Sequence, residues 1–347
     1  MKKLPILTVI GLVFGIAAAE ITARIIDLPP ELYKLQLNST GSVFKVSDNH
    51  ILGFEFKKNY RDENADMITS YHYTNSHGLR DVERSIEKTG PRVILLGDSV
   101  VAGHGLPNLN YTISRQLEAM LNAGGYNWEV LNFGISGYTT LQEVELLKER
   151  GLQFSPDIVI LFFLTNDNPV ENTLVSLYGP EDINFFLRSI FLHSRLFRHI
   201  LIRFNLFDVR FKTDSAYRQA VNDAHSDYIT GAVAELEKLS REHNFDLYVV
   251  DFPRFHNSYN ISYVEQKWKN DLIFVQMTAF LEKRGIPMID VIDYYLRDYN
   301  QSPRTLHVSD RYSVNDSIHA NRFGGSIAAQ ALLDELTRLY YGNGERR

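Results

Sequence analysis

The stretch Arg92–Val93–Ile94–Leu95–Leu96–Gly97–Asp98–Ser99 decides the fold that we predict for this chain. Its apolar run is short and continuous, which is typical of a β-strand buried on both faces of a parallel sheet. Gly97–Asp98–Ser99 ends the run with small and polar residues, and a helical segment follows around Ser114–Leu121. Reactive side chains in open parallel sheets gather where the strands end. The Ser99 hydroxyl is therefore predicted to lie at a reactive edge.

The same alternation of buried strand and helix continues outward from this stretch. It predicts an α/β fold, with a central parallel sheet and helices covering both faces. Strands are predicted at Glu129–Phe133, Asp157–Leu164, Leu247–Asp251 and Met288–Val291, and helices near Leu141–Arg150, Ile229–His243, Val264–Arg284 and Ser326–Tyr340.

The composition fits a globular protein with one sizeable domain and an accessory segment. The chain has 347 residues, of which 44% are apolar and 22% are charged, and this profile excludes disordered, collagen-like and coiled-coil chains. The formal net charge is −6, so no overall positive field would hold a polyanion, and no nucleic-acid partner is expected. Without cysteine, the chain has neither a disulfide framework nor a thiolate metal site.

Residues 1–28 differ from the rest and are predicted to be a targeting element. Lys2 and Lys3 precede an uncharged run from Leu4 to Ala19, and such a run could remain as a membrane-spanning signal anchor. Ala17–Ala18–Ala19 instead offers the small-residue site of a cleavable signal peptide. Under either alternative, the lysines keep the N-terminus cytoplasmic and place the remainder in the periplasm or outside the cell.

Two further segments lie outside the alternation of strands and helices. Residues 29–90 carry polar-aromatic alternation, such as Tyr71–His72–Tyr73–Thr74, and are predicted to form a small strand-rich lead-in. Residues 168–225 interrupt the domain predicted at 91–343 and are a candidate lid. Within them, residues 185–204 are rich in aromatic side chains and arginines. This pattern fits a helix resting on anionic headgroups, or a helix packed on the sheet with solvated arginines.

Ser99, Asp316 and His319 are the candidate catalytic residues. A serine hydroxyl is a poor nucleophile at neutral pH unless an imidazole takes its proton and a carboxylate orients that imidazole. Asp316–Ser317–Ile318–His319, before the last predicted helix, supplies both groups. The alternative is helix capping, with Ser99 as an N-cap and Asp316–His319 as a capping pair. Asp98 is expected to organise the turn rather than to react.

Attack on an ester carbonyl also requires donors for the developing oxyanion, each worth about 3 kcal/mol of barrier. The backbone amides of Ser99 and Gly137 and the side chain of Asn166 are candidates, because each follows a different predicted strand. Glycine at 137 leaves room for a substrate and reaches backbone angles that other residues avoid. Tyr138 and Thr165 are candidate pocket residues, although Tyr138 could equally pack in the core.

Together these blocks resemble the SGNH, or GDSL-type, hydrolase superfamily, in the family's order. Gly97–Asp98–Ser99 matches the nucleophile block, Gly137 the glycine block, Asn166 the asparagine block, and Asp316 with His319 the final DxxH block. The resemblance spans residues 92–341. It implies a flavodoxin-like three-layer α/β/α sandwich and the hydrolysis of esters, sometimes acyl transfer.

Two other positions bear on this resemblance. Thr165 departs from the family where glycine often stands, which affects the expected width of the oxyanion pocket. Asn75–Ser76–His77–Gly78–Leu79–Arg80 resembles the segment before the domain in N-terminally membrane-anchored bacterial members.

The leading hypothesis is a serine esterase or acylhydrolase that acts on an acylated lipid or an acylated glycan. The N-terminal helix would tether it to the membrane, with residues 185–204 as a second membrane contact, or signal cleavage would release it. One alternative is an O-acyltransferase that modifies envelope or exported polysaccharide through the same acyl-enzyme. Another is a non-catalytic envelope scaffold. No cofactor or metal is expected, because the remaining histidines lack metal-ligand spacing.

Overall fold

The computed structural model describes residues 3–26, 43–47, 49, 52, 54–62, 71–164, 190, 194–204, 215–302, 305–314 and 316–341. The chain divides into two compact units. The first contains residues 1–54 and 169–222, and the second contains residues 55–168 and 223–347. The predicted sheet lies in the second unit.

This sheet has five strands in the order β4-β3-β5-β6-β7. Every neighbouring pair is parallel, so the predicted α/β fold with a central parallel sheet is confirmed. Because β4 and β5 flank β3, the segments that follow these strands leave the same edge of the sheet. The bounds are β3 Arg92–Gly97, β4 Glu129–Gly134, β5 Ile158–Phe163, β6 Asp246–Asp251 and β7 Met288–Asp290.

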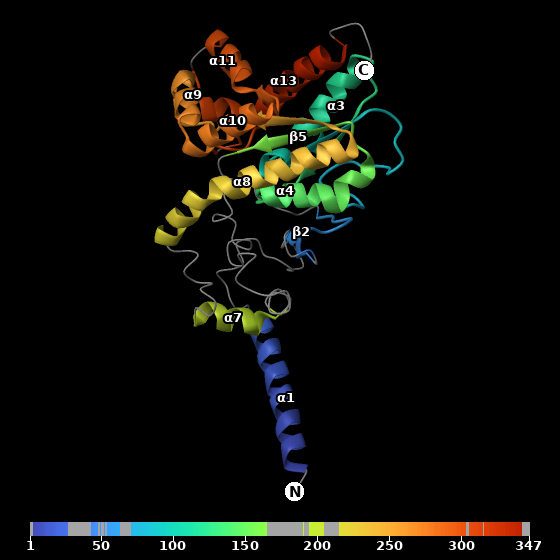
Figure 1. The fold of residues 1–347 in the computed structure, drawn as a ribbon, viewed down its shortest axis with the longest axis vertical. Coiled ribbons are helices and arrows are strands. Elements are labelled where there is room, and N and C mark those ends of the chain that lie inside the picture. Colours follow the sequence, from blue (N-terminus) through green and yellow to red (C-terminus); the bar gives the residue numbers. More distant parts are fainter. Residues whose placement is uncertain are drawn as a thin grey trace. The chain divides into compact units, whose positions relative to one another are not determined.

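Helices cover both faces of the sheet. Figure 1 shows α3 and α13 over one face and α4 and α8 over the other. Leu95 of the sheet, Leu117 of α3 and Leu332 of α13 share one buried apolar cluster. The bounds are α2 Ser99–Ala102, α3 Ile113–Ala123, α4 Thr140–Leu146, α8 Ser215–His243, α9 Ile261–Lys269, α10 Leu272–Arg284, α11 Ile292–Gln301, α12 Val308–Tyr312 and α13 Arg322–Tyr341. A π-helical turn, Leu147–Gly151, and two 3₁₀ turns, Leu109–Tyr111 and Leu152–Phe154, complete these elements.

The prediction of one helix over Val264–Arg284 is wrong. The chain forms α9 and α10 there, because Asp271 caps a new helix and its side chain accepts the Ile273 N–H at 3.0 Å. A second difference is that α8 begins at Ser215 rather than near Ile229. The sequence analysis also missed α11, which buries Ile292, Tyr295 and Tyr299 along one helical face in an otherwise polar segment.

The predicted lead-in contains only short pieces of strand among its described residues. β1 (Phe44–Val46) and β2 (Phe54–Phe56) form a two-stranded sheet. One further antiparallel bridge joins Arg61 and Tyr73. From Thr74 to Gly90 the chain has no strand, and polar side chains hold it in place instead.

The described part of the first unit consists mainly of α1 (Lys3–Ile25) and α7 (Arg195–Arg203). The Glu20 carboxylate of α1 accepts the Ser194 hydroxyl at 2.8 Å and the Leu196 N–H at 3.0 Å, so it caps the start of α7. It also pairs with Arg24, one turn along α1, at 2.8 Å.

The predicted membrane anchor is not confirmed. Among the helices of the described residues, none combines the length and the apolarity needed to cross a bilayer. Much of the candidate lid at 168–225, including 185–189 and 191–193 of the predicted membrane contact, lies outside the described residues.

Candidate active site

The nucleophile turn is built by Asp98 at the end of β3. The Asp98 carboxylate accepts the Val100 N–H at 2.9 Å, so it caps α2, and it lies 3.3 Å from the Ser99 hydroxyl oxygen. Ser99 is the first residue of this short helix and is 7% exposed. Asp98 therefore organises the turn, and it is Asp98 rather than Ser99 that is the helix cap.

The loop between α12 and α13 carries Asp316 and His319. One oxygen of Asp316 accepts the backbone N–H groups of Ile318 and His319, each at 2.8 Å. Its other oxygen lies 2.6 Å from His319 Nδ1. Burial alone would raise the pKa of Asp316, but these hydrogen bonds hold it below its ordinary value. Asp316 therefore stays ionised and holds the Nδ1 end of the imidazole.

The loop brings His319 to the nucleophile turn. His319 Nε2 lies 2.7 Å from Ser99 Oγ, although the two residues are 220 positions apart in sequence. With the proton on Nδ1 donated to Asp316, Nε2 is free to accept the serine hydroxyl. The predicted serine, histidine and aspartate thus form one continuous line of hydrogen bonds. Neither residue of the Asp316–His319 pair caps α13, because Asn321 accepts the Gly324 N–H at 2.8 Å.

Gly137 lies in the loop that follows β4. Its φ of +83° lies in the left-handed region, which glycine adopts at little cost. Among the described residues, neither the Ser99 amide nor the Gly137 amide donates a hydrogen bond to another protein group. Two candidate oxyanion donors are thus present. Asn166 and Thr165 lie outside the described residues, so their predicted roles stay predictions.

Tyr138, next to Gly137, is 2% exposed and belongs to the core. Burial raises the pKa of its hydroxyl well above the ordinary value. This position favours core packing over the pocket-wall alternative.

Asn132 and Gly134 hold the end of β4 against α2, a contact that the sequence patterns did not predict. The Asn132 side chain donates to the Val101 carbonyl at 2.8 Å and accepts the Gly134 N–H at 2.9 Å. A Cβ on Gly134 would lie 2.1 Å from the Ala102 nitrogen. Glycine is therefore required at 134 for the close approach of the β4 and α2 backbones.

The segment 71–84 also builds the site, which the sequence analysis did not predict. Arg80 is 4% exposed, and its guanidinium donates to the carbonyls of Ala102, Gly103 and Leu106, the first at 2.8 Å. These carbonyls belong to the turn that follows Ser99. The sequence signal for this segment was the resemblance of Asn75–Arg80 to a segment of membrane-anchored family members. That resemblance did not predict which residues the segment would contact.

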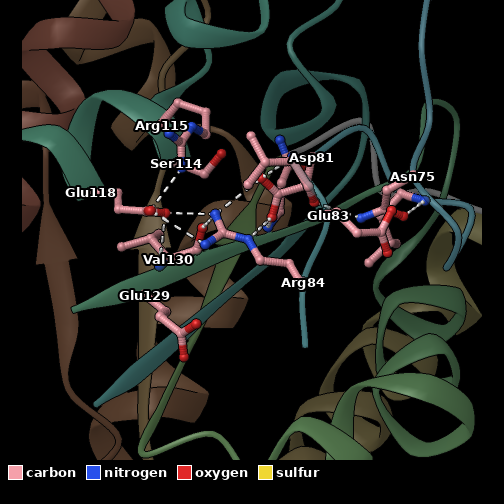
Figure 2. A network of polar contacts seen from close by, with 12 residues as sticks. Asn75, Asp81, Glu83, Arg84, Ser114, Arg115, Glu118, Glu129 and Val130 are labelled. Carbon is pink, nitrogen blue, oxygen red and sulfur yellow. Dashed lines mark hydrogen bonds and ion pairs between the residues drawn. The ribbon is translucent and has the colours of Figure 1, made fainter. Parts of the chain in front are cut away.

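A buried charge network fastens the same segment to the sheet and to α3. Figure 2 shows Arg84 between Asp81 and Glu118, at 2.8 and 2.6 Å respectively. Asp81 also accepts the Asn132 N–H at 3.2 Å, which links the network to β4. Burial works against the charge of Arg84, but its two carboxylate partners raise its pKa above the ordinary value. Arg84 therefore stays charged.

Metal ligation finds no support in the part of the chain that the structure describes. No group of three or more His, Asp or Glu side chains there could hold an ion.

Comparisons with known proteins give a family and a set of similar folds. The model of the GDSL-like Lipase/Acylhydrolase family matches residues 95–324. The search of curated proteins gave no match. An acetyl xylan esterase, AlAXEase, is similar in structure with 14% identity and a TM-score of 0.45, over 71% of this chain and 99% of that one.

Two further solved structures match this chain with similar sequence identities, coverages and TM-scores. LAE5, an α/β hydrolase from the metagenome of Lake Arreo, Spain, has 16% identity and a TM-score of 0.45, over 72% of this chain and 96% of that one. A member of the lipolytic protein G-D-S-L family from Veillonella parvula DSM 2008 has 13% identity and a TM-score of 0.42, over 72% and 100%. The family match includes Ser99, Gly137 and His319. The chain belongs to the GDSL-like lipase/acylhydrolase (SGNH) family and is a serine hydrolase that acts on ester bonds.

Proposed function

We propose that Ser99, His319 and Asp316 form the catalytic triad of an esterase that cleaves an O-acyl ester. Ser99 Oγ attacks the acyl carbon while its proton passes to His319 Nε2. The protonated imidazole then gives that proton to the leaving alcohol, and Asp316 stabilises the imidazolium throughout. Water attacks the acyl-enzyme in the second half of the reaction, again with His319 as the base, and releases the acid.

The observation that carries this proposal is the line of contacts from Ser99 to Asp316. Its two distances, 2.7 Å at Nε2 and 2.6 Å at Nδ1, are those of hydrogen bonds suited to proton transfer. The exposed fractions of the His319 and Asp316 side chains are 17% and 37%, so the base borders solvent and a substrate can reach it.

The oxyanion forms within reach of three donors in this proposal. These are the backbone amides of Ser99 and Gly137 and the side-chain amide of Asn166. The left-handed φ of Gly137 and the absence of another described acceptor for either backbone amide support this role. Thr165, next to Asn166, limits the width of the acyl pocket.

Substitution of the nucleophile tests the proposal. In Ser99→Ala, we expect the rate of p-nitrophenol release from p-nitrophenyl acetate to fall by about 10⁴-fold, with folding unchanged. Ser85→Ala, on the exposed part of the segment before β3, serves as the control and keeps full activity. Full activity in Ser99→Ala would overturn the assignment.

Hydrolysis rather than transfer is the function that we propose, and product analysis separates the two. A purified sample is given an acetyl ester donor together with a glycan acceptor. Free acid as the only acyl product supports an esterase. Ester formed on the acceptor would replace this proposal with an O-acyltransferase that uses the same acyl-enzyme.

We further propose that residues 1–28 direct the second unit across a membrane. Supporting this are Lys2 and Lys3 before the uncharged run Leu4–Ala19, and apolar side chains of α1 that face outward, with Phe14 73% exposed. Cell fractionation and intact mass test the proposal. Extracytoplasmic protein of full mass indicates an anchor, and loss of about 2 kDa indicates signal cleavage. Full-length protein in the cytoplasmic fraction would contradict both.

A further inference from the structure

A second imidazole, that of His104, packs against the proposed catalytic base. The ring centroids of His104 and His319 are 4.4 Å apart, with an angle of 41° between the ring planes. On its other side His104 meets the edge of Tyr71, at 6.1 Å between centroids. Neither His104 nor Tyr71 takes part in the mechanism proposed above, so that mechanism does not explain the packing of His104 against His319.

The backbone around His104 is fixed. Its N–H donates to the Ser99 carbonyl at 2.9 Å, so His104 closes the turn that begins at the nucleophile. Gly103 and Gly105 flank it with φ values of +76° and +72°, in the left-handed region that favours glycine. Arg80 binds the carbonyls of Gly103 and Leu106. The position of the His104 ring is thus set by the same turn that positions Ser99.

His104 is neutral above about pH 4. Burial, followed by the nearby His319 and Arg80, lowers its pKa from 6.5 to about 4, against the opposing effect of Asp316. Tyr71, whose ring packs against His104, is itself held neutral because burial raises its pKa. The Asp316 carboxylate contacts His319 rather than His104.

We propose that His104 is a positioning residue, whose uncharged ring, with Tyr71 behind it, holds the plane of His319 so that Nε2 stays directed at Ser99 Oγ. This inference rests on the proposed function. The Asp316 contact fixes only one end of the imidazole, and rotation of the ring about that end moves Nε2. Packing against a flat neighbour removes this freedom, and small misplacements of a base cost up to about 10²-fold in rate.

An uncharged neighbour also protects the transition state. His319 carries a positive charge while the oxyanion exists, and a cation within a few ångströms would oppose that charge at low effective dielectric. A ring that stays neutral down to about pH 4 provides packing without repulsion. Phenylalanine would supply the same packing without titrating, whereas alanine supplies neither a ring nor a charge.

The first experiment compares His104→Ala with His104→Phe. We expect kcat for p-nitrophenyl acetate to fall about 10-fold in His104→Ala with KM changed less than 2-fold, and His104→Phe to recover most of this loss. A kcat in His104→Ala equal to that of the unmodified chain would overturn the proposal. So would an equal loss in both variants. If His104→Ala fails to fold, His104→Met takes its place.

The second experiment compares His104→Lys with the uncharged His104→Met, which has a side chain of similar length. A cation beside His319 disfavours protonation of the base. The acid limb of the kcat/KM profile is therefore expected at lower pH in His104→Lys than in His104→Met, with a lower plateau. Identical limbs would show that position 104 does not act on His319. A purely structural role would not move the limb.

Thermal unfolding gives a readout that needs no activity. The pKa of His104 is about 6.5 in the unfolded chain and about 4 in the folded chain. Between these pH values the unfolded chain therefore binds a proton that the folded chain does not bind. The free energy of unfolding falls as the pH drops through this window. We expect the Tm of the unmodified protein to fall more steeply from pH 6.5 to 4 than that of His104→Phe. Parallel curves would contradict the buried neutral state. The proposed function fails separately, if Ser99→Ala keeps its activity.

Discussion

The segment 71–84 and helix α1 both precede the residues that match the family model, yet they differ in what their side chains do. Asp81 is 0% exposed and Arg80 4%. Arg80 donates to the carbonyls of the turn that follows Ser99, and Asp81 accepts the Asn132 N–H of β4. In α1 the apolar side chains of Leu12 and Phe14 are 64% and 73% exposed. The first segment is a structural part of the active site. A segment that precedes the residues matched by the family model can therefore still be part of the structure of the active site.

Loss of the charge at Arg84 is expected to have the largest effect on stability. Arg84→Met leaves Asp81 and Glu118 without their shared counter-ion in the interior, and breaking such a pair costs about 3–5 kcal/mol. Urea unfolding measures the change. Lys88→Met is the matched control, because Lys88 and Asp157 pair at 2.6 Å with side chains 34% and 39% exposed, and such pairs contribute about 0–1 kcal/mol. Equal effects of the two substitutions would break the comparison.

Removal of the Arg80 guanidinium tests the link from the same segment to the nucleophile turn. Arg80→Met leaves the buried carbonyls of Ala102, Gly103 and Leu106 without this donor, at a cost of about 1–3 kcal/mol. Because these carbonyls belong to the turn after Ser99, we expect kcat to fall about 10-fold as well. Steady-state kinetics at a temperature where the variant is folded measure this. A stability loss with unchanged kcat would show that Arg80 supports the fold alone.

The smallest effect is expected in α1. Phe14→Ala removes a side chain that is 73% exposed. The free energy of unfolding of the second unit, which contains Ser99 and His319, should therefore change by less than about 0.5 kcal/mol. Its kcat should also equal that of the unmodified protein. Urea unfolding, followed by the fluorescence of Trp128 in the second unit, measures this free energy. A change as large as that of Arg80→Met would remove the distinction between the two regions.

The sheet and the order of the site residues could be predicted because both depend on local patterns. Continuous apolar runs such as Val93–Leu96 mark strands buried on two faces, and parallel strands expose their ends at one edge. That rule placed Ser99, whereas His319 follows α12 rather than a strand and was assigned because a serine nucleophile needs an imidazole to take its proton. The helix break at Asp271 was also readable in principle, since aspartate is a strong N-cap.

The contacts of Arg80, Arg84 and His104 could not be predicted in this way. Each depends on which distant backbone groups face a side chain, and neither periodicity nor spacing carries that information. Arg80 in particular lies in a segment without strand or helix, so no element fixed its direction. The close approach at Gly134 is similar, because a glycine in a turn and a glycine against a neighbouring backbone look alike in sequence.

Active-site labelling tests the central claim most directly. The folded protein is treated with a fluorophosphonate, and the adduct is located by mass spectrometry of the intact chain and its peptides. We expect one adduct, on Ser99, because His319 Nε2 lies within hydrogen-bond distance of its hydroxyl and can take its proton. An adduct on another serine, or none in folded protein, would contradict the proposed triad.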